Sequence, residues 1–509
     1  MINLPIRQKI TIMLAVMSGM LLAALDQTIV ATALPRIVSQ LHGLQDLSWV
    51  VTAYLLTSTI AVPISGKLSD IYGRKKIFLI AIFIFVIGSA LSGLSQNMAE
   101  LIGFRALQGV GAGMLMSSAF AVIGDLFTPK ERGRWQGIIG AVFGLASVVG
   151  PLLGGYLTDH ASWRWNFYIN VPVGIVAFFM ISRFMPHIEP DKKDQRIDYL
   201  GAGLLAGGLA TLLLGFVWGG NQYAWASFEV IGIFILSAIL LAAFALVEKG
   251  RPSMAILPLD LFKNSIFSLS MLIVFLIGVA MFGAILYIPL FAQDVLGRSA
   301  TNSGVILTPM VLTLVVVSII SGQLVSRTGQ YKKIAITGSA LITIGLLWLS
   351  QVSVFTTNAE LTLRMMLVGA GLGMSMPIFN LIVQNAFEHA RLGVVTSSVQ
   401  MFRSIGATVG VAVMGSILNN RLAQNLAHTA SRVTASELNS LNPHTISFAI
   451  KHALASSISD LFLISGVIVS GAFFASWFLK EIPLRSSHSP EPKPTASEGG
   501  APGAPGVIH

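Results

Sequence analysis

The stretch GKLSDIYGRKK, residues 66–76, has an echo at residues 322–332, which read GQLVSRTGQYK. Four letters recur in register: Gly66, Leu68, Gly73 and Lys76 match Gly322, Leu324, Gly329 and Lys332. Each copy lies in a short polar segment between two long apolar runs. This repeat predicts a chain built from two related halves.

The apolar run that follows each copy supports the same division. RALQGVGAGM at 105–114 resembles RMMLVGAGLGM at 364–374, with a slip of one residue. We therefore expect an N-terminal six-helix half over residues 8–187 and a C-terminal six-helix half over 262–480. The two apolar runs within 198–248 have no counterpart, and we interpret them as two inserted helices. Two related halves that rock about a central site are typical of a transporter.

The composition of the chain places these runs in a membrane. Of the 509 residues, 54% are hydrophobic and only 11% are charged, whereas a soluble domain carries about 25% charged residues. Cysteine is absent, which excludes disulfides and thiolate metal sites. Because a membrane helix needs about 20 mostly apolar residues, we expect an all-α integral membrane protein with 14 transmembrane helices. The fourteen runs are 10–34, 48–66, 77–95, 101–123, 136–157, 165–183, 198–218, 229–247, 267–290, 303–322, 334–352, 361–383, 394–418 and 459–479.

The distribution of Lys and Arg predicts the orientation. With the N-terminus inside, most basic residues fall in cytoplasmic segments, and the even number of spans returns the C-terminus to the cytoplasm. These segments account for the net charge of +10, so we expect no nucleic-acid partner. The location that fits is the plasma membrane, which in a bacterium is the cytoplasmic membrane.

Two segments lie outside the spans. Residues 419–458 form a long outer loop with apolar residues among polar ones, which favours a short interfacial helix or hairpin. Residues 486–509 are rich in Ser, Pro and Gly and are typical of a disordered cytoplasmic tail.

The first span contains a carboxylate, Asp26, within LLAALDQTIVATALP at 21–35. An Asp at the centre of a membrane helix costs roughly 3 kcal/mol on insertion scales, so we expect it to face a cavity or a partner. Arg105 lies in the outer half of its span, as Asp26 does, and we expect the two to form a switchable pair. Proton binding and release by Asp26 would then drive the switch. The alternative is a structural Asp that accepts a hydrogen bond from a neighbouring helix.

The second half carries its own basic residues inside spans, Arg364 and Arg403. Snorkelling of the side chain toward the outer interface accounts for Arg364, as it would for Arg105. It accounts less well for Arg403, which lies well inside its span.

The 66–76 loop carries a charge pair between two glycines. Gly66 and Gly73 permit unusual backbone angles, and Asp70 and Arg74 are one helical turn apart. Positive-inside anchoring explains the lysines of this loop but not the Asp. We expect Asp70 to pair, in one conformational state only, with a cation or a helix N-terminus of the other half.

The stretch GPLLGGYL, residues 150–157, interrupts an apolar run. Pro151 removes one helical hydrogen bond, and Gly154 with Gly155 loosens the next turn. Gly150 and Gly154 also form a small-xxx-small pair that lets helices approach closely. We expect a bent or tightly packed helix near the outer side.

Together these segments resemble the major facilitator superfamily, and within it the fourteen-span drug:proton antiporter branch. LDQTIVATALP is similar to the first-helix motif of that branch, GKLSDIYGRKK to the superfamily loop motif between helices 2 and 3, and RALQGVGAGM to the helix-4 motif. GPLLGGYL is similar to the helix-5 antiporter motif, and WRWNFYINVPVG at 163–174 to the start of helix 6.

This resemblance implies roles for individual residues. Asp26 and Arg105 would carry proton coupling, and Asp70 and Arg74 would stabilise one gating state. The glycines and proline of residues 150–155 would shape helix 5.

The resulting prediction is a proton-coupled antiporter, not an enzyme, that exports lipophilic drugs or similar small molecules by alternating access. We expect a monomer in the lipid bilayer with no cofactor, driven by the proton gradient; a GxxxxGK[ST] loop for ATP is absent from the sequence. The predicted spans hold no second deep acidic residue, which favours neutral, zwitterionic or monocationic substrates over dications. The cavity should be apolar and aromatic with a few polar groups. Candidate lining residues are Tyr54, Phe120, Phe143, Met374, Met376, Phe379, Asn380, Gln400 and Arg403.

Two alternatives remain open. A dedicated exporter of one metabolite, siderophore, lipid or amino acid would carry the same sequence features. A membrane sensor or structural partner that no longer transports is the second, and the intact Asp26 and loop motif argue against it.

Overall fold

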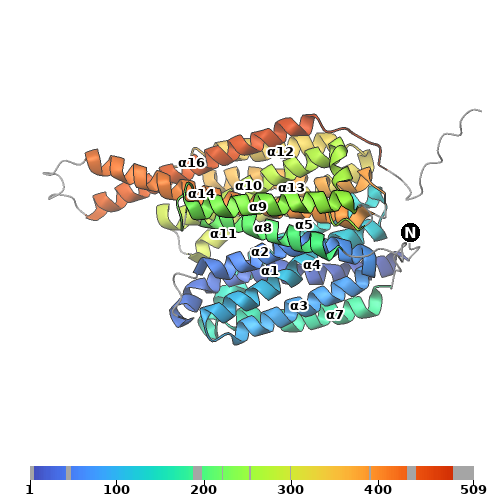
Figure 1. The fold of residues 1–509 in the computed structure, drawn as a ribbon. Coiled ribbons are helices and arrows are strands. Elements are labelled where there is room, and N and C mark those ends of the chain that lie inside the picture. The colour runs from blue at the N-terminus through green and yellow to red at the C-terminus, as the bar shows by residue number, and fades with distance from the viewer. Residues whose placement is uncertain are drawn as a thin grey trace, which may run out of the picture.

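The computed structural model describes residues 5–41, 47–186, 198–220, 222–251, 254–297, 300–388, 391–432 and 443–484. Its regular elements in these ranges are helices, and one isolated β-bridge joins Gly219 to Tyr223. The helices form an elongated bundle (Figure 1). In chain order they are α1 (Ile6–Leu41), α2 (Leu47–Tyr72), α3 (Arg74–Leu94), α4 (Met98–Leu126), α5 (Pro129–His160), α6 (Trp165–Tyr168), α7 (Asn170–Phe184), α8 (Tyr199–Trp218), α9 (Phe228–Gly250), η2 (Leu259–Lys263), α10 (Ser265–Leu290), η3 (Phe291–Val295), α11 (Ala300–Thr328), α12 (Tyr331–Leu349), α13 (Asn358–Ala386), α14 (Leu392–Arg432) and α16 (Pro443–Trp477).

Most of these helices are long and apolar enough to span a bilayer. Within the described residues, 13 helical segments meet that criterion, and they coincide with thirteen of the predicted spans. The remaining predicted span, 267–290, falls on α10, where the described apolar run is Ser265–Met281. The prediction of an all-helical, multi-span membrane protein is therefore confirmed.

The helices share two hydrophobic cores. One core is built from residues between Ile12 and Met185, on α1 to α7 and their connections. The other contains the C-terminal helices, Leu209 of α8 and Phe244 of α9, and also Val62 of α2. The two groups lie one above the other in Figure 1, with α8 and α9 in front of the boundary between them. The pair α8–α9 thus packs with the second core and touches the first.

The loop repeat seen in the sequence is also a repeat of backbone shape. Gly73 has φ of 89° and Gly329 has φ of 73°, both in the left-handed region that disfavours a side chain. In each copy this turn joins two antiparallel helices, α2 to α3 and α11 to α12. The chain therefore reverses direction at these two places through a glycine with positive φ.

At one end of the bundle, which we call the termini end, lie the N-terminus and the C-terminal end of α16 (Figure 1). The two groups of helices touch here along two seams. In the α2–α14 seam a Cβ on Gly66 would overlap Ser397, and in the α5–α11 seam a Cβ on Gly133 would lie 2.9 Å from the carbonyl oxygen of Gly322. Because only glycine allows such close approach, the termini end is tightly closed.

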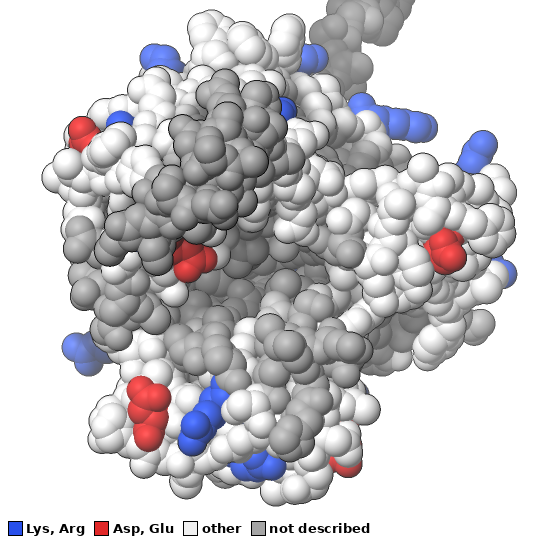
Figure 2. Space-filling model, turned by 90° about the vertical axis from the view of Figure 1, so that its left-hand side faces the viewer, with Lys and Arg blue, Asp and Glu red and all other residues white. Residues whose placement is uncertain are grey.

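The opposite end, which we call the far end, is hollowed. Figure 2 looks onto this face and shows a depression between the groups of helices. On α5 the contacts with α11 reach Gly144, which lies against Val315, while Gly155 nearer the far end has no atom within 4 Å of its Cβ position. The conformation is closed at the termini end and open at the far end.

Helices α14 and α16 project beyond the bundle at the far end (Figure 1, left). They extend through much of the predicted outer loop 419–458, since α14 continues to Arg432 and α16 begins at Pro443. An ion pair of 3.5 Å between Arg421 and Asp460 joins them. Residues 433–442 and the predicted tail 486–509 lie outside the described residues.

Candidate functional site

The carboxylate of Asp26, in the middle of α1, is fully buried and accepts three hydrogen bonds. Arg105 Nη1 donates to Oδ2 over 2.5 Å, and Gln108 Nε2 donates to Oδ1 over 2.8 Å. Asn170 Nδ2 donates to the same Oδ1 over 3.1 Å. The pair that the sequence predicted between Asp26 and Arg105 is present, with two amide donors beside it.

Two helices bring these donors to Asp26. Arg105 and Gln108 are one turn apart on α4, so both reach the same face of the helix. Asn170 is the first residue of α7. The polar groups of α4 and α7 therefore satisfy a charge on α1 that lipid or apolar packing would not tolerate.

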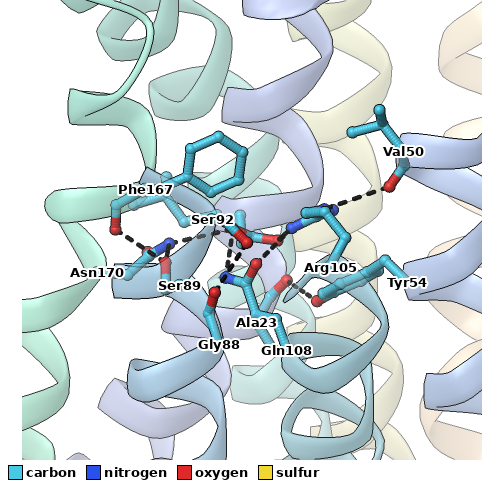
Figure 3. A network of polar contacts seen from close by, with 12 residues as sticks. Ala23, Val50, Tyr54, Gly88, Ser89, Ser92, Arg105, Gln108, Phe167 and Asn170 are labelled. Atoms are coloured by element: carbon cyan, nitrogen blue, oxygen red, sulfur yellow. Dashed lines mark hydrogen bonds and ion pairs between the residues drawn. The ribbon is translucent and has the colours of Figure 1, made fainter. Parts of the chain in front are cut away.

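Arg105 also contacts two further hydrogen-bond acceptors and two aromatic rings. Its Nε donates to the carbonyl oxygen of Val50 over 3.3 Å, and Nη1 also donates to Gln108 Oε1 over 2.7 Å (Figure 3). The guanidinium lies 4.2 Å from the centroid of the Tyr54 ring and 5.7 Å from that of Phe167. Cation–π contacts of this kind strengthen where water is excluded. The aromatic rings therefore hold the cation in place as well as its hydrogen bonds do.

A second layer of contacts orients Asn170. Its Nδ2 also donates to Ser89 Oγ over 3.0 Å, and Ser89 Oγ donates to the carbonyl oxygen of Phe167 over 2.8 Å (Figure 3). The amide oxygen of Asn170 is buried and has no hydrogen-bond partner. An unused acceptor therefore lies on the same amide group that holds Asp26.

The charge pair of the 66–76 loop is part of a larger buried cluster. Arg74 Nη2 lies 2.5 Å from Asp70 Oδ1, and Arg74 Nε donates to Asp125 Oδ2 over 2.8 Å. Arg74 Nη1 donates to Ser69 Oγ over 2.8 Å. The sharp turn at Gly73 folds Arg74, at the start of α3, back onto the end of α2, so the cluster joins α2, α3 and α4.

Asp70 also touches the other half of the molecule. A Cβ on Gly393, in the first turn of α14, would overlap the Asp70 carboxylate. The positive end of the helix dipole of α14 thus lies beside a negative charge on α2, which is the favourable arrangement. The helix N-terminus that the sequence analysis expected as a partner of Asp70 is that of α14.

The helix-5 stretch packs α5 against α1 near Asp26. A Cβ on Gly150 would overlap Thr28 Oγ1, and this hydroxyl donates to the carbonyl oxygen of Ala146 over 2.9 Å. Helix α5 continues through Pro151 without a break. Gly154 is buried, and its carbonyl oxygen accepts a hydrogen bond from Thr158. Gly150 therefore permits the close contact two residues away from Asp26.

The candidate cavity residues are dispersed. Tyr54 belongs to the Arg105 site, and its hydroxyl donates to the carbonyl oxygen of Ala23 over 3.3 Å. Arg403 donates a hydrogen bond to Gln400 one turn away. The others are buried or half-buried, and their described contacts do not join them around one pocket: Phe120, Phe143, Met374, Met376, Phe379 and Asn380. Among these candidates, the structure brings together Gln400 with Arg403, and Asn380 with Met376, whose carbonyl oxygen accepts from Asn380 Nδ2 over 3.4 Å.

Comparison with known proteins identifies the family. The model of the Major Facilitator Superfamily matches residues 16–198 and 199–411. The chain is 45% identical to the multidrug transporter protein MdtP of Bacillus subtilis (strain 168), over 79% of this chain and 74% of that protein. The chain belongs to the Major Facilitator Superfamily. This confirms the resemblance drawn from the sequence motifs.

Two further comparisons place the chain within the superfamily. It is 39% identical to multidrug resistance protein 3 of Bacillus subtilis (strain 168), over 82% of this chain and 80% of that one. The crystal structure of the human organic anion transporter MFSD10 has the same fold, with a TM-score of 0.63 and 17% identity, over 92% of this chain and 100% of that one. The protein is therefore a multi-pass membrane transporter related to multidrug efflux proteins.

The sequence analysis did not predict three partners of the charged residues. Gln108 and Asn170 both lie inside the quoted motifs, and the one-turn spacing of Gln108 from Arg105 was a usable signal. Asp125 lies at the end of α4 and gave no such signal. Its contact with Arg74 depends on where α4 ends relative to the loop.

Proposed function

We propose that this protein is a proton-coupled antiporter that exports lipophilic drugs or similar small molecules by alternating access, across the cytoplasmic membrane in a bacterium. The observation that carries the proposal is the fully buried carboxylate of Asp26, held by Arg105, Gln108 and Asn170. A site of this kind changes its contacts when a proton binds, because protonation removes the charge that Arg105 neutralises.

The burial of Asp26 links proton binding to a conformational change. In the described conformation no part of its side chain is exposed, so a proton reaches it only when α1, α4 or α7 moves. Once protonated, the carboxyl group becomes a donor. The unused amide oxygen of Asn170 supplies an acceptor after rotation of that amide. The site accommodates both charge states, but with different contacts.

Helix α4 provides a mechanical link between the two charged sites. It carries Arg105 and Gln108 toward Asp26 and, at its other end, Asp125 toward Arg74. A shift of α4 that follows loss of the Asp26–Arg105 pair would therefore reach the Asp70–Arg74–Asp125 cluster. That cluster positions Asp70 against α14 and so stabilises the closed termini end.

The transport cycle follows from this arrangement. With the termini end in the cytoplasm, as the Lys and Arg distribution predicts, the described conformation faces outward. Protonation from outside would weaken the Asp26–Arg105 pair and allow the termini end to open for substrate. Release of the proton inside would restore the pair. Each proton contributes about 2.3 kcal/mol per 100 mV of membrane potential.

Relatives support the class of substrate. Both curated relatives are named for multidrug transport or resistance, and we extend this to lipophilic neutral, zwitterionic or monocationic molecules. A dedicated exporter of one metabolite, siderophore, lipid or amino acid would use the same proton site. A substrate panel distinguishes the two, since a dedicated exporter would move one chemical class only.

The test is transport in proteoliposomes with an imposed pH gradient, with wild type beside Asp26→Asn. We expect wild type to accumulate dyes against their gradient and to release protons when substrate is added. Asp26→Asn should still bind substrate. It should only let the substrate equilibrate across the membrane, without accumulation against its gradient. Asp159→Asn, which removes an exposed carboxylate of α5, is the matched control and should behave as wild type. Uphill accumulation by Asp26→Asn with unchanged pH dependence would refute Asp26 as the coupling site.

A further inference from the structure

The two seams at the termini end are related by the sequence repeat, but they differ in charge. In the repeated segments 66–76 and 322–332, Ser326 takes the position of Asp70. The α2–α14 seam therefore has a carboxylate where the α5–α11 seam has a hydroxyl.

The two positions have equivalent neighbours. Asp70 on α2 lies against Gly393 near the start of α14, and Ser326 on α11 lies 3.3 Å from the Cβ position of Gly133 near the start of α5. Ser326 thus occupies, on its own seam, the place where Asp70 puts a negative charge on the other.

A pocket of about 310 Å³ opens beside Ser326. Its other lining residues are Arg134 of α5 and Gln323 and Arg327 of α11, so residues of both halves form its wall. The lining contains two cations, an amide and a hydroxyl, and no acid.

Arg134 and Arg327 are both exposed, and neither forms an ion pair with the described part of the chain. Glu131, one turn from Arg134, is held in the capping box of α5, where it accepts hydrogen bonds from Thr128. Two guanidinium groups on one pocket repel each other unless an anion lies between them.

We propose that this pocket binds a phosphate group, which supplies the negative charge that Asp70 provides in the other seam. Arginine forks match phosphate oxygens in pairs, and the amide of Gln323 adds a further donor. The Ser326 hydroxyl already donates to the carbonyl oxygen of Gly322. The phosphate comes either from the headgroup of an anionic phospholipid or from phosphate free in solution. Because the ligand touches α5 and α11 together, binding favours the conformation with the termini end closed. This site is separate from the Asp26 site and does not depend on proton coupling.

The experiment compares Arg134→Gln/Arg327→Gln with Lys249→Gln/Lys333→Gln, which removes the same charge from exposed positions at the same end. Inorganic phosphate is titrated into delipidated protein in detergent, with the rise in Tm as the readout. Phosphatidylglycerol bound per protein is counted by native mass spectrometry after extraction from mixed phosphatidylcholine nanodiscs. Losing charge-assisted hydrogen bonds should weaken binding by about tenfold or more in the arginine variant only.

A further variant, Ser326→Asp, separates the proposal from misfolding. It places a carboxylate at the position equivalent to Asp70, so it should keep or raise Tm while abolishing the response to the ligand. A Tm rise with phosphate would identify free phosphate as sufficient, and retention of phosphatidylglycerol alone would identify the lipid headgroup. Either result supports the site if the Arg134→Gln/Arg327→Gln variant no longer binds the ligand. No binding by wild type, or equal binding by the arginine and lysine variants, overturns it.

Discussion

Arg105 Nη1 and Asp26 Oδ2 lie 2.5 Å apart between α4 and α1, on side chains that are at most 2% exposed. Separating a pair so completely buried is costly, because each charge would then lack an opposite charge in a largely apolar interior. Loss of either charge therefore has a larger effect than a surface pair would have.

The first prediction concerns the stability of this pair. Arg105→Gln should destabilise the folded protein by about 3–5 kcal/mol, because it leaves Asp26 charged and buried. Adding Asp26→Asn should recover most of that loss. The free energies of unfolding of wild type, both single variants and the double variant are measured in nanodiscs. Compared as a double-mutant cycle, they give the coupling energy between Arg105 and Asp26.

The exposed pair Arg421–Asp460, with side chains 50% and 37% exposed, provides the control cycle. It should show a coupling of about 0–1 kcal/mol. Equal coupling energies in the two cycles would contradict the importance of burial.

The second prediction concerns the amide donors of Asp26. Gln108→Ala and Asn170→Ala each remove one hydrogen bond to the charged form of the carboxylate, so protons should compete more easily. Half-maximal proton-driven transport should move to higher pH, with folding retained. Transport measured from pH 5 to 9 tests this, with the exposed Gln351→Ala as control. A fall in rate with no movement of the pH profile would show that these amides only support the fold.

The third prediction concerns the close approach of α2 and α14. Gly393→Ala places a methyl group into the Asp70 carboxylate, so the seam should separate and the closed termini end should become less populated. Spin labels at positions 72 and 388, both exposed, report the distance across this end. Gly232→Ala, whose methyl group meets no atom within 4 Å, should leave the distribution as in wild type.

The fourth prediction concerns the charge of Asp70. Asp70→Asn keeps the size of the side chain but removes its attraction to Arg74 and to the N-terminus of α14. The same spin-label pair should show a shift toward the separated state. Asp159→Asn again serves as the control. Identical distance distributions in Asp70→Asn and wild type would remove the gating role of Asp70.

Much of the architecture could be predicted from the sequence. The positions of thirteen spans and the repeat of residues 66–76 depend on apolar length and on local turns, and both are properties of short segments. The pairing of Asp26 with Arg105 could be predicted because a lone acid in lipid needs a nearby cation. The contacts of Asp125 and Asn170 could not, since they depend on how neighbouring helices are rotated.

The sequence by itself determined that this chain crosses a membrane many times as helices, because hydrophobic length acts locally. Only the tertiary structure decided which end is closed and which partners each buried charge finds. The physical reason is that the face each helix turns inward is set by packing against its neighbours, and the spacing of apolar residues in a membrane helix does not encode it.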